Sequence, residues 1–167
     1  MRERKGVPTG GGPIEGNKRV TKFVDLPPVW LMAFIGAVWL VGRVVPLPVF
    51  GGLGDGLALV LAGAGAGLFA AAIWEMGRAR TTVIPHRIPA ALVTTGVFRL
   101  SRNPIYLGDV AFLLAAILWL DVPLALPLVA VFVRIITTRF IAGEEARLRA
   151  GFGAAYDAWA SRVRRWL

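Results

Sequence analysis

The residues that could do chemistry gather in two stretches of an otherwise strongly apolar chain. One stretch contains His86, Arg99, Arg102, Asn103, Tyr106 and Asp109, and the other contains Arg134, Arg139, Glu144 and Glu145. No Ser/His/Asp triad, P-loop or EF-hand can be assembled from these residues. With one histidine and no cysteine in the sequence, a zinc site lacks enough good ligands and a thiolate nucleophile is excluded.

The elements that must position these side chains are apolar blocks. Of 167 residues, 56% are hydrophobic and 17% are charged, with a mean hydropathy of +0.65, whereas a globular chain has about 45–50% apolar and about 25% charged residues. The excess predicts an all-α integral membrane protein with about four transmembrane helices. We place these helices at Val29–Val45, Leu57–Met76, Pro104–Asp121 and Pro123–Ala142, and the last two form a helical hairpin because their connection is so short.

The chain divides into a polar tail (1–28), two transmembrane helices (29–77) and a core (78–167) that holds a connector, the hairpin and a C-terminal helix. From Gly143 onward, apolar residues recur with helical spacing among arginines and alanines, which is typical of a basic amphipathic helix at the membrane interface. Gly151 and Gly153 weaken this helix, so a break or a close contact is expected there.

The basic residues responsible for the net charge of +9 lie mainly in alternate loops. This distribution follows the positive-inside rule, which places both termini and the 78–103 connector in the cytoplasm and the turns at 46–56 and 121–122 outside. It also argues against nucleic acid as a partner, because the charges do not follow one groove. No cleavable signal peptide is indicated ahead of residue 29.

The hairpin brings the two polar stretches together, since the third helix begins where the fourth ends. We therefore expect a polar site at the cytoplasmic face. Arg134 either snorkels to the interface or faces the interior of the bundle as a functional charge. The glycines at 63, 65 and 67 predict close helix packing, either within the chain or in a homo-oligomer, with a ligand groove as the alternative.

Two motifs in the core resemble the signatures of the isoprenylcysteine carboxyl methyltransferase family. The first spans residues 82–86, 92–99 and 101–108 and contains Arg102-Asn103-Pro104-Ile105-Tyr106. The second begins with Glu144-Glu145-Ala146-Arg147-Leu148 and continues through Phe152-Gly153 and Tyr156. Their combination is specific and covers roughly residues 78–167, whereas the first two helices match only in hydropathy.

The resemblance implies an enzyme that uses S-adenosylmethionine, with no metal, and that methylates a lipophilic acceptor entering from the membrane lipids. It implies catalytic roles for Arg102 and Glu144, to which Arg139 is added although it has no secure counterpart in the family. It also implies that the cofactor is held by His86, Val93, Gly96, Asn103, Tyr106 and Glu145. Asn103 stands where the eukaryotic enzymes have histidine, so the role of that imidazole does not transfer.

Two other functions remain open at this point. Sterol reductases, which use NADPH, look similar around the Pro104–Tyr106 motif, and Gly108-Asp109 strengthens that likeness, although those proteins have more spans. A non-enzymatic membrane scaffold is the third reading. The acceptor of a methyltransferase could be a carboxylate, a thiol or an amine, and the high glycine, alanine and arginine content suggests a bacterial inner membrane.

Overall fold

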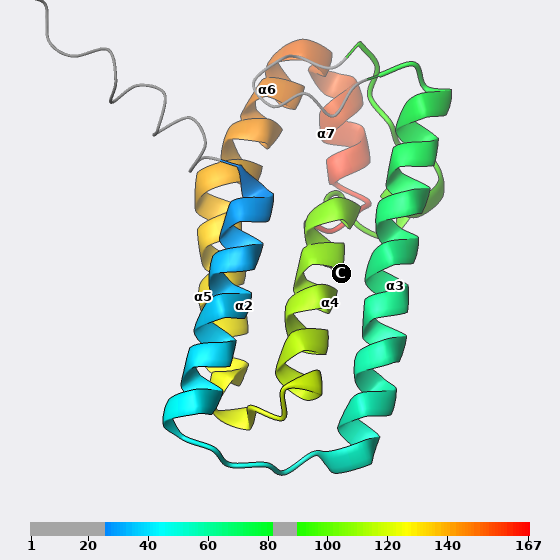
Figure 1. Ribbon diagram of the computed structural model, residues 1–167. Coiled ribbons are helices and arrows are strands. Elements are labelled where there is room, and N and C mark those ends of the chain that lie inside the picture. The colour runs from blue at the N-terminus through cyan, green and yellow to red at the C-terminus, as the bar shows by residue number, and fades with distance from the viewer. Residues whose placement is uncertain (1–25, 82–89) are drawn as a thin grey trace, which may run out of the picture.

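The computed structural model describes residues 26–81 and 90–167, and this part of the chain folds into helices without strands (Figure 1). The bundle consists of α2 (Pro27–Val44), α3 (Gly51–Arg78), α4 (Pro104–Trp119) and α5 (Leu126–Ile136). Short helical turns, η1 (Gly96–Arg99) and η2 (Pro123–Ala125), precede α4 and α5. A π-helical turn, η3 (Thr137–Ile141), joins α5 to α6 (Ala142–Phe152), and α7 (Ala154–Ala160) follows. The predicted all-α fold class is confirmed.

Within the described residues, three helical stretches are long and apolar enough to cross a membrane: Pro27–Val44, Gly51–Arg78 and Pro123–Phe152. The fourth predicted span, α4, is apolar but has only 16 residues. At 1.5 Å per residue it is about 24 Å long, which is less than the roughly 30 Å of a hydrocarbon core. Because α4 packs against α2, α3 and α5, it lies in the centre of the bundle, where neighbouring helices cover part of its surface.

The start of α3 differs from the prediction, since Gly51–Gly56 is helical rather than part of the outer loop. The carboxylate of Asp121 accepts hydrogen bonds from the backbone N–H groups of Val49 and Phe50, each at 2.8 Å, and of Gly51 at 3.1 Å. These donors would otherwise lack partners at a helix N-terminus. The helix therefore starts early because of a contact with the hairpin turn some 70 residues away, which the local sequence does not show.

The packing predicted for the glycine stripe of α3 is found at Gly65. A Cβ atom at Gly65 would lie 3.0 Å from the carbonyl oxygen of Gly108 in α4, and a Cβ at Gly108 would lie 3.1 Å from that of Gly65. Gly63 and Gly67 have open space around their Cα atoms. The close approach of α3 and α4 thus depends on one glycine from each helix.

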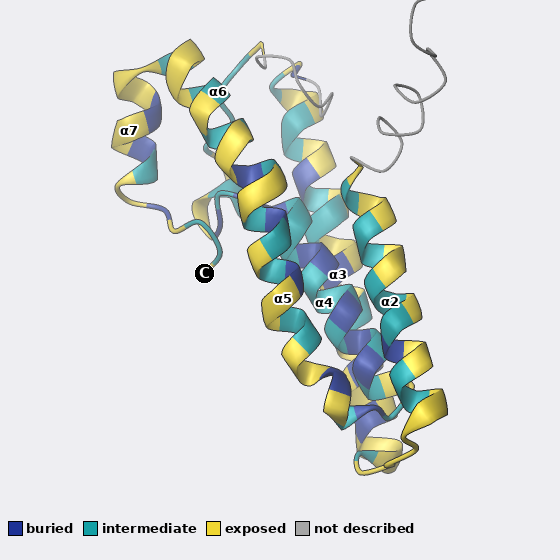
Figure 2. Cartoon of the chain, turned by 90° about the vertical axis from the view of Figure 1, so that its left-hand side faces the viewer, coloured by how far each residue is buried: buried dark blue, intermediate teal, exposed yellow. Residues whose placement is uncertain are grey.

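The main core lies along α4, where Leu113 and Ile117 are fully buried together with Val38, Phe132 and Ile136 from α2 and α5. The outer faces of the helices are exposed (Figure 2), and many of their side chains are large and apolar. In water such a surface would be unfavourable, but a bilayer provides an apolar environment for it. The burial pattern agrees with a bundle that is immersed in lipid.

The C-terminal helical segment breaks at Gly153, which has a φ of +47°, so the predicted break is confirmed there. After this break α7 reverses direction beside α6 (Figure 1). Tyr156, Trp159 and Val163 are buried in a second cluster, in contact with connector residues that include Leu92 and Phe98. The apolar face that was expected to rest on the membrane interface packs against the connector instead.

Candidate functional site

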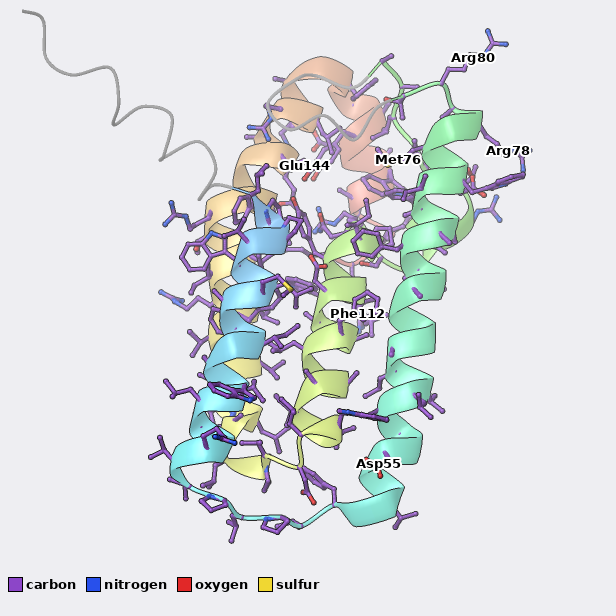
Figure 3. All side chains as sticks on the ribbon, in the orientation of Figure 1. Asp55, Met76, Arg78, Arg80, Phe112 and Glu144 are labelled. Carbon is purple, nitrogen blue, oxygen red and sulfur yellow. The ribbon has the colours of Figure 1, made fainter. Side chains whose placement is uncertain are left out.

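Polar side chains from four segments meet at one end of the bundle, where α4 begins and the long α5–α6 stretch leaves it (Figure 3). Five residues that the sequence indicated are brought together here, as the hairpin geometry predicted. They are Arg102, Asn103, Tyr106, Glu144 and Glu145. We call these residues, together with Tyr156 and Arg165, the polar network.

Glu145 is the acidic centre of the polar network. Its carboxylate forms an ion pair with Nη1 of Arg102 at 3.2 Å. It also accepts two hydrogen bonds from Arg165, from Nε at 3.0 Å and from Nη2 at 2.6 Å. Only 13% of the Glu145 side chain and 15% of the Arg102 side chain are exposed, so this charge cluster is held away from water and its geometry is fixed by paired, directional contacts.

The last residues of the chain hold the segment before α4 in place. The backbone N–H of Arg102 donates to the carbonyl of Arg164 at 2.9 Å. The carbonyl of Arg165 accepts hydrogen bonds from Oγ of Ser101 at 3.2 Å and from Nδ2 of Asn103 at 3.0 Å. The side-chain amide of Asn103 therefore holds the C-terminal segment, and Asn103 supports the structure of the site.

Arg102 also contacts α7, because its Nη1 donates to the hydroxyl of Tyr156 at 3.2 Å. Burial and the nearby Glu145 carboxylate raise the pKa of Tyr156, while Arg102 opposes this shift, so the hydroxyl is neutral at physiological pH. The buried Nε of Arg102 has no hydrogen-bond partner within the described residues. An unsatisfied guanidinium donor in a buried position is suited to an anionic group of a ligand.

A second acidic residue lies beside the first on α6. The hydroxyl of Tyr106, in the first turns of α4, donates to Oε2 of Glu144 at 3.4 Å. Both side chains are half-buried. The two neighbouring glutamates thus contact different partners, Tyr106 for Glu144 and the two arginines for Glu145, and together they give the site two carboxylates next to a buried guanidinium.

The connector is fastened to the end of α3 at Gly96. Oγ1 of Thr95 donates to Oε2 of Glu75 at 2.5 Å. Gly96 has a φ of +56°, and a Cβ atom at this position would collide with the Glu75 carboxylate. The positive φ favours glycine at this position, and a Cβ atom there would force the Glu75 side chain to move.

The other sequence-indicated residues within the described part of the chain have different surroundings. Val93 is half-buried three residues before Gly96, and His86 is outside the described residues. The guanidinium of Arg139 is 5.1 Å from the ring centroid of Trp30, which places it against α2. Arg134 is exposed on the surface of α5, in agreement with the snorkelling interpretation.

Arg165 belongs to the polar network but was not indicated by the sequence. Arg165 belongs to a basic C-terminal run that resembles an ordinary interfacial patch, and its partner is 20 residues away. Tyr156 belongs to the second motif, but the motif does not indicate its contact with Arg102. The position of Tyr156 in the same motif as Glu144 and Glu145 was the sequence signal that could have indicated this contact.

The arrangement suits a ligand that carries both charges. It offers two carboxylates for a cationic group and an unsatisfied arginine donor for an anionic one. Among the described residues, no three acidic or histidine side chains are grouped so that they could hold a metal ion. The site therefore provides binding and orientation by charge and hydrogen bonds.

Comparison with known proteins gives one result. A family model described as phospholipid methyltransferase matches residues 55–155, which include α4, α5, α6 and most of α3. No curated protein and no solved structure shows significant similarity to the chain. The matched range covers more than half of the chain and contains Arg102, Asn103, Tyr106, Glu144 and Glu145.

Proposed function

Because the chain belongs to the phospholipid methyltransferase family, we propose that it transfers the methyl group of S-adenosylmethionine to a lipophilic acceptor at the cytoplasmic face of a membrane. Family membership and the apolar helices identify a membrane methyltransferase. The dependence on S-adenosylmethionine and the nature of the acceptor are the parts that we propose. The observation that carries the proposal is the convergence of the motif residues in one partly buried polar network.

The residues present fit this cofactor. S-adenosylmethionine carries a carboxylate, an ammonium group and a sulfonium, and the unsatisfied Nε of Arg102 is a suitable donor for the carboxylate. Glu145, already held by Arg102 and Arg165, would take the ammonium group by sharing its carboxylate oxygens. The backbone around Gly96, which closes against Glu75, would form another part of the binding site.

When bound, the sulfonium supplies an activated methyl group and requires no metal. The chain's own residues must then bind the donor, align the acceptor for an in-line attack and keep water away. Arg165 contributes through Glu145, since its two hydrogen bonds fix the direction of that carboxylate. Tyr106 packs against the main core of the bundle, and its hydroxyl contacts Glu144 on α6.

We also propose a finer placement, which rests on the sequence. The paired motifs support a bacterial-type relative of the isoprenylcysteine carboxyl methyltransferases within this broader family. The basic residues near the network and both termini support a cytoplasmic site in a bacterial inner membrane. A family model for methyltransferases gives no support to the reductase or scaffold readings.

Calorimetric titration of the purified protein in detergent with S-adenosylhomocysteine, the demethylated cofactor, tests the proposal. We expect saturable micromolar binding that weakens at least tenfold in Glu145→Gln and in Arg102→Lys, because lysine lacks the planar set of donors. Asp157→Asn is the matched control, since Asp157 pairs with Arg149 at the exposed surface, and should leave binding unchanged. Binding of NADPH instead would favour a reductase, and binding of neither would contradict the proposal.

A further inference from the structure

Two segments next to the polar network carry positive charge that the network does not use. Residues 96–103 and 158–167 contain five arginines and no acidic residue. Two of these arginines pair with Glu145 inside the polar network. The other three are exposed, and they are Arg99, Arg162 and Arg164. Within the described part of the chain, no hydrogen bond or ion pair reaches the guanidinium of Arg99 or of Arg164.

The two segments run side by side at the start of α4. The indole N–H of Trp159 donates to the carbonyl of Phe98 at 3.2 Å, and the backbone N–H of Arg102 donates to the carbonyl of Arg164 at 2.9 Å. The exposed arginines are within two residues of these contacts, so they share one edge of the molecule. We call the exposed residues of the two segments the basic rim, and they are Arg99, Leu100, Arg162, Arg164 and Leu167.

The basic rim lies where the apolar bundle begins. Trp166, next to the rim, packs against the main core of the bundle, and the C-terminal end of the chain is level with the first turns of α4 (Figure 1). Leu100 and Leu167 are 64% and 70% exposed among the arginines. Exposed apolar side chains flanked by arginines are typical of a membrane interface, where arginines reach the phosphates and apolar side chains reach the acyl chains.

Anionic phospholipid head groups match the charge of this surface. A guanidinium donates paired hydrogen bonds to phosphate oxygens, and three arginines without an acidic neighbour attract a negatively charged leaflet. A basic residue close to such a leaflet raises membrane affinity roughly fivefold. A zwitterionic head group offers the same phosphate but adds a cation that the arginines repel.

The segment that carries the rim also positions the polar network. The carbonyl of Arg164 holds the backbone of Arg102, and the carbonyl of Arg165 holds the side chain of Asn103. The side chain of Arg165 fixes the carboxylate of Glu145 with two hydrogen bonds. A head group that restrains Arg164 therefore restrains the segment that orients this network. A site that is ordered in advance loses less entropy when its ligand binds.

We propose that the basic rim binds anionic phospholipid head groups and that this contact tightens binding at the cofactor site. The lipid acts through the C-terminal segment and is neither the methyl donor nor the acceptor. This inference rests on the proposed function, because the affinity that changes is that for the cofactor.

The test uses the full chain in nanodiscs of phosphatidylcholine alone and of phosphatidylcholine mixed with phosphatidylglycerol. Calorimetric titration with S-adenosylhomocysteine measures the cofactor site in each lipid. Lipids that are brominated on their acyl chains report the rim, because bromine quenches the fluorescence of a tryptophan that it touches. The difference in quenching between the wild type and Trp166→Phe gives the preference for phosphatidylglycerol over phosphatidylcholine next to Trp166.

We expect brominated phosphatidylglycerol to quench Trp166 more strongly than brominated phosphatidylcholine, and S-adenosylhomocysteine to bind about fivefold more tightly in the anionic nanodiscs. Saturating S-adenosylhomocysteine should raise the lipid preference at Trp166 by the same factor, because coupling between two binding sites is reciprocal.

Arg164→Gln should remove most of both effects, yet it should bind S-adenosylhomocysteine like the wild type in phosphatidylcholine alone, which shows that the variant is folded. Arg43→Gln is the matched control. Arg43 lies over Trp39 near the other end of the bundle, so this variant loses the same charge and should keep both effects.

Equal quenching of Trp166 by the two brominated lipids would overturn head-group binding, and equal S-adenosylhomocysteine affinity in the two nanodiscs would overturn the coupling. If inorganic phosphate reproduces the tighter binding in phosphatidylcholine alone, the rim binds a free anion and the lipid assignment is wrong. If the wild type binds S-adenosylhomocysteine in neither lipid, the proposed function fails, whereas quenching of Trp166 still decides whether the rim binds anionic lipid.

Discussion

Replacing Arg165 by methionine should destabilise the fold much more than an ordinary surface charge would. Removing one partner of a buried ion pair costs about 3–5 kcal/mol, whereas an exposed pair contributes about 0–1 kcal/mol. The Arg165 side chain is 40% exposed and Glu145 is 13% exposed, and Arg102 remains 3.2 Å from the carboxylate in the variant. The expected loss is therefore intermediate, about 2 kcal/mol.

The assay is thermal unfolding of the purified protein in detergent. For a chain of this length, about 1 kcal/mol shifts Tm by about 2–4 °C, so Arg165→Met should lower Tm by about 4–8 °C. Arg149→Met is the matched control, because the Arg149–Asp157 pair has the same chemistry with side chains that are 59% and 55% exposed. Its Tm should fall by no more than about 2 °C.

A double substitution separates the ion pair from other effects of Arg165. The carbonyl of Arg165 still accepts its hydrogen bonds from Ser101 and Asn103 in any side-chain variant. Glu145→Gln combined with Arg165→Met should therefore cost clearly less than the sum of the single substitutions. If Arg165→Met and Arg149→Met lower Tm equally, or if the two substitutions are additive, the buried ion pair is not what holds the C-terminal segment.

Three further predictions concern other contacts. The hydrogen bonds from the backbone of Phe50, Val49 and Gly51 hold the pKa of Asp121 below its ordinary value, so the stability that Asp121 contributes is present above about pH 4 and is lost as the pH falls through the lowered pKa. The Tm difference between wild type and Asp121→Asn should therefore be largest near neutral pH and should shrink in acid. A Tm difference that grows in acid would contradict this sign. Gly96→Ala should lower the free energy of unfolding by about 1–3 kcal/mol and weaken S-adenosylhomocysteine binding, because the position has a φ of +56° and a Cβ would meet Glu75. Gly67→Ala, in the open part of α3, is the control: it should leave binding unchanged and should leave stability unchanged or raise it. Gly65→Val should lower Tm by several degrees through the α3–α4 contact, whereas Gly63→Val, which has free space, should have little effect; similar shifts for both variants would show that the helices do not pack at Gly65.

The general fold follows from the sequence because hydropathy and proline positions are local signals. The four apolar blocks, the short turn after α4 and the break at Gly153 were all predictable in this way. The start of α3 was not predictable, because it depends on Asp121 from another hairpin. The burial of Trp159 was not predictable either, since its indole N–H donates to the carbonyl of Phe98 in the connector, and amphipathic spacing alone is the same for a helix on lipid and a helix on protein.

The site could be predicted as a region but not as a set of contacts. The hairpin geometry was sufficient to bring Tyr106 and Glu144 together, because one lies at the start of α4 and the other near the end of the long α5–α6 stretch. Arg165 could not be predicted as the partner of Glu145, because the sequence does not show where residues near 165 lie in space and no spacing in the sequence links the two. The guanidinium of Arg139, which was placed among the catalytic residues, lies over the ring of Trp30 on α2, and its catalytic role stays a prediction.

The hydrogen bonds of Asp121 also constrain how the protein assembles. The hairpin of α2 and α3 emerges first during synthesis, yet the backbone N–H groups at Val49, Phe50 and Gly51 find their partner only when the second hairpin arrives. Until then, these N–H groups at the start of α3 can donate only to water. Asp121 therefore couples the start of α3 to the presence of the second hairpin, so the two halves of the bundle depend on each other at this end.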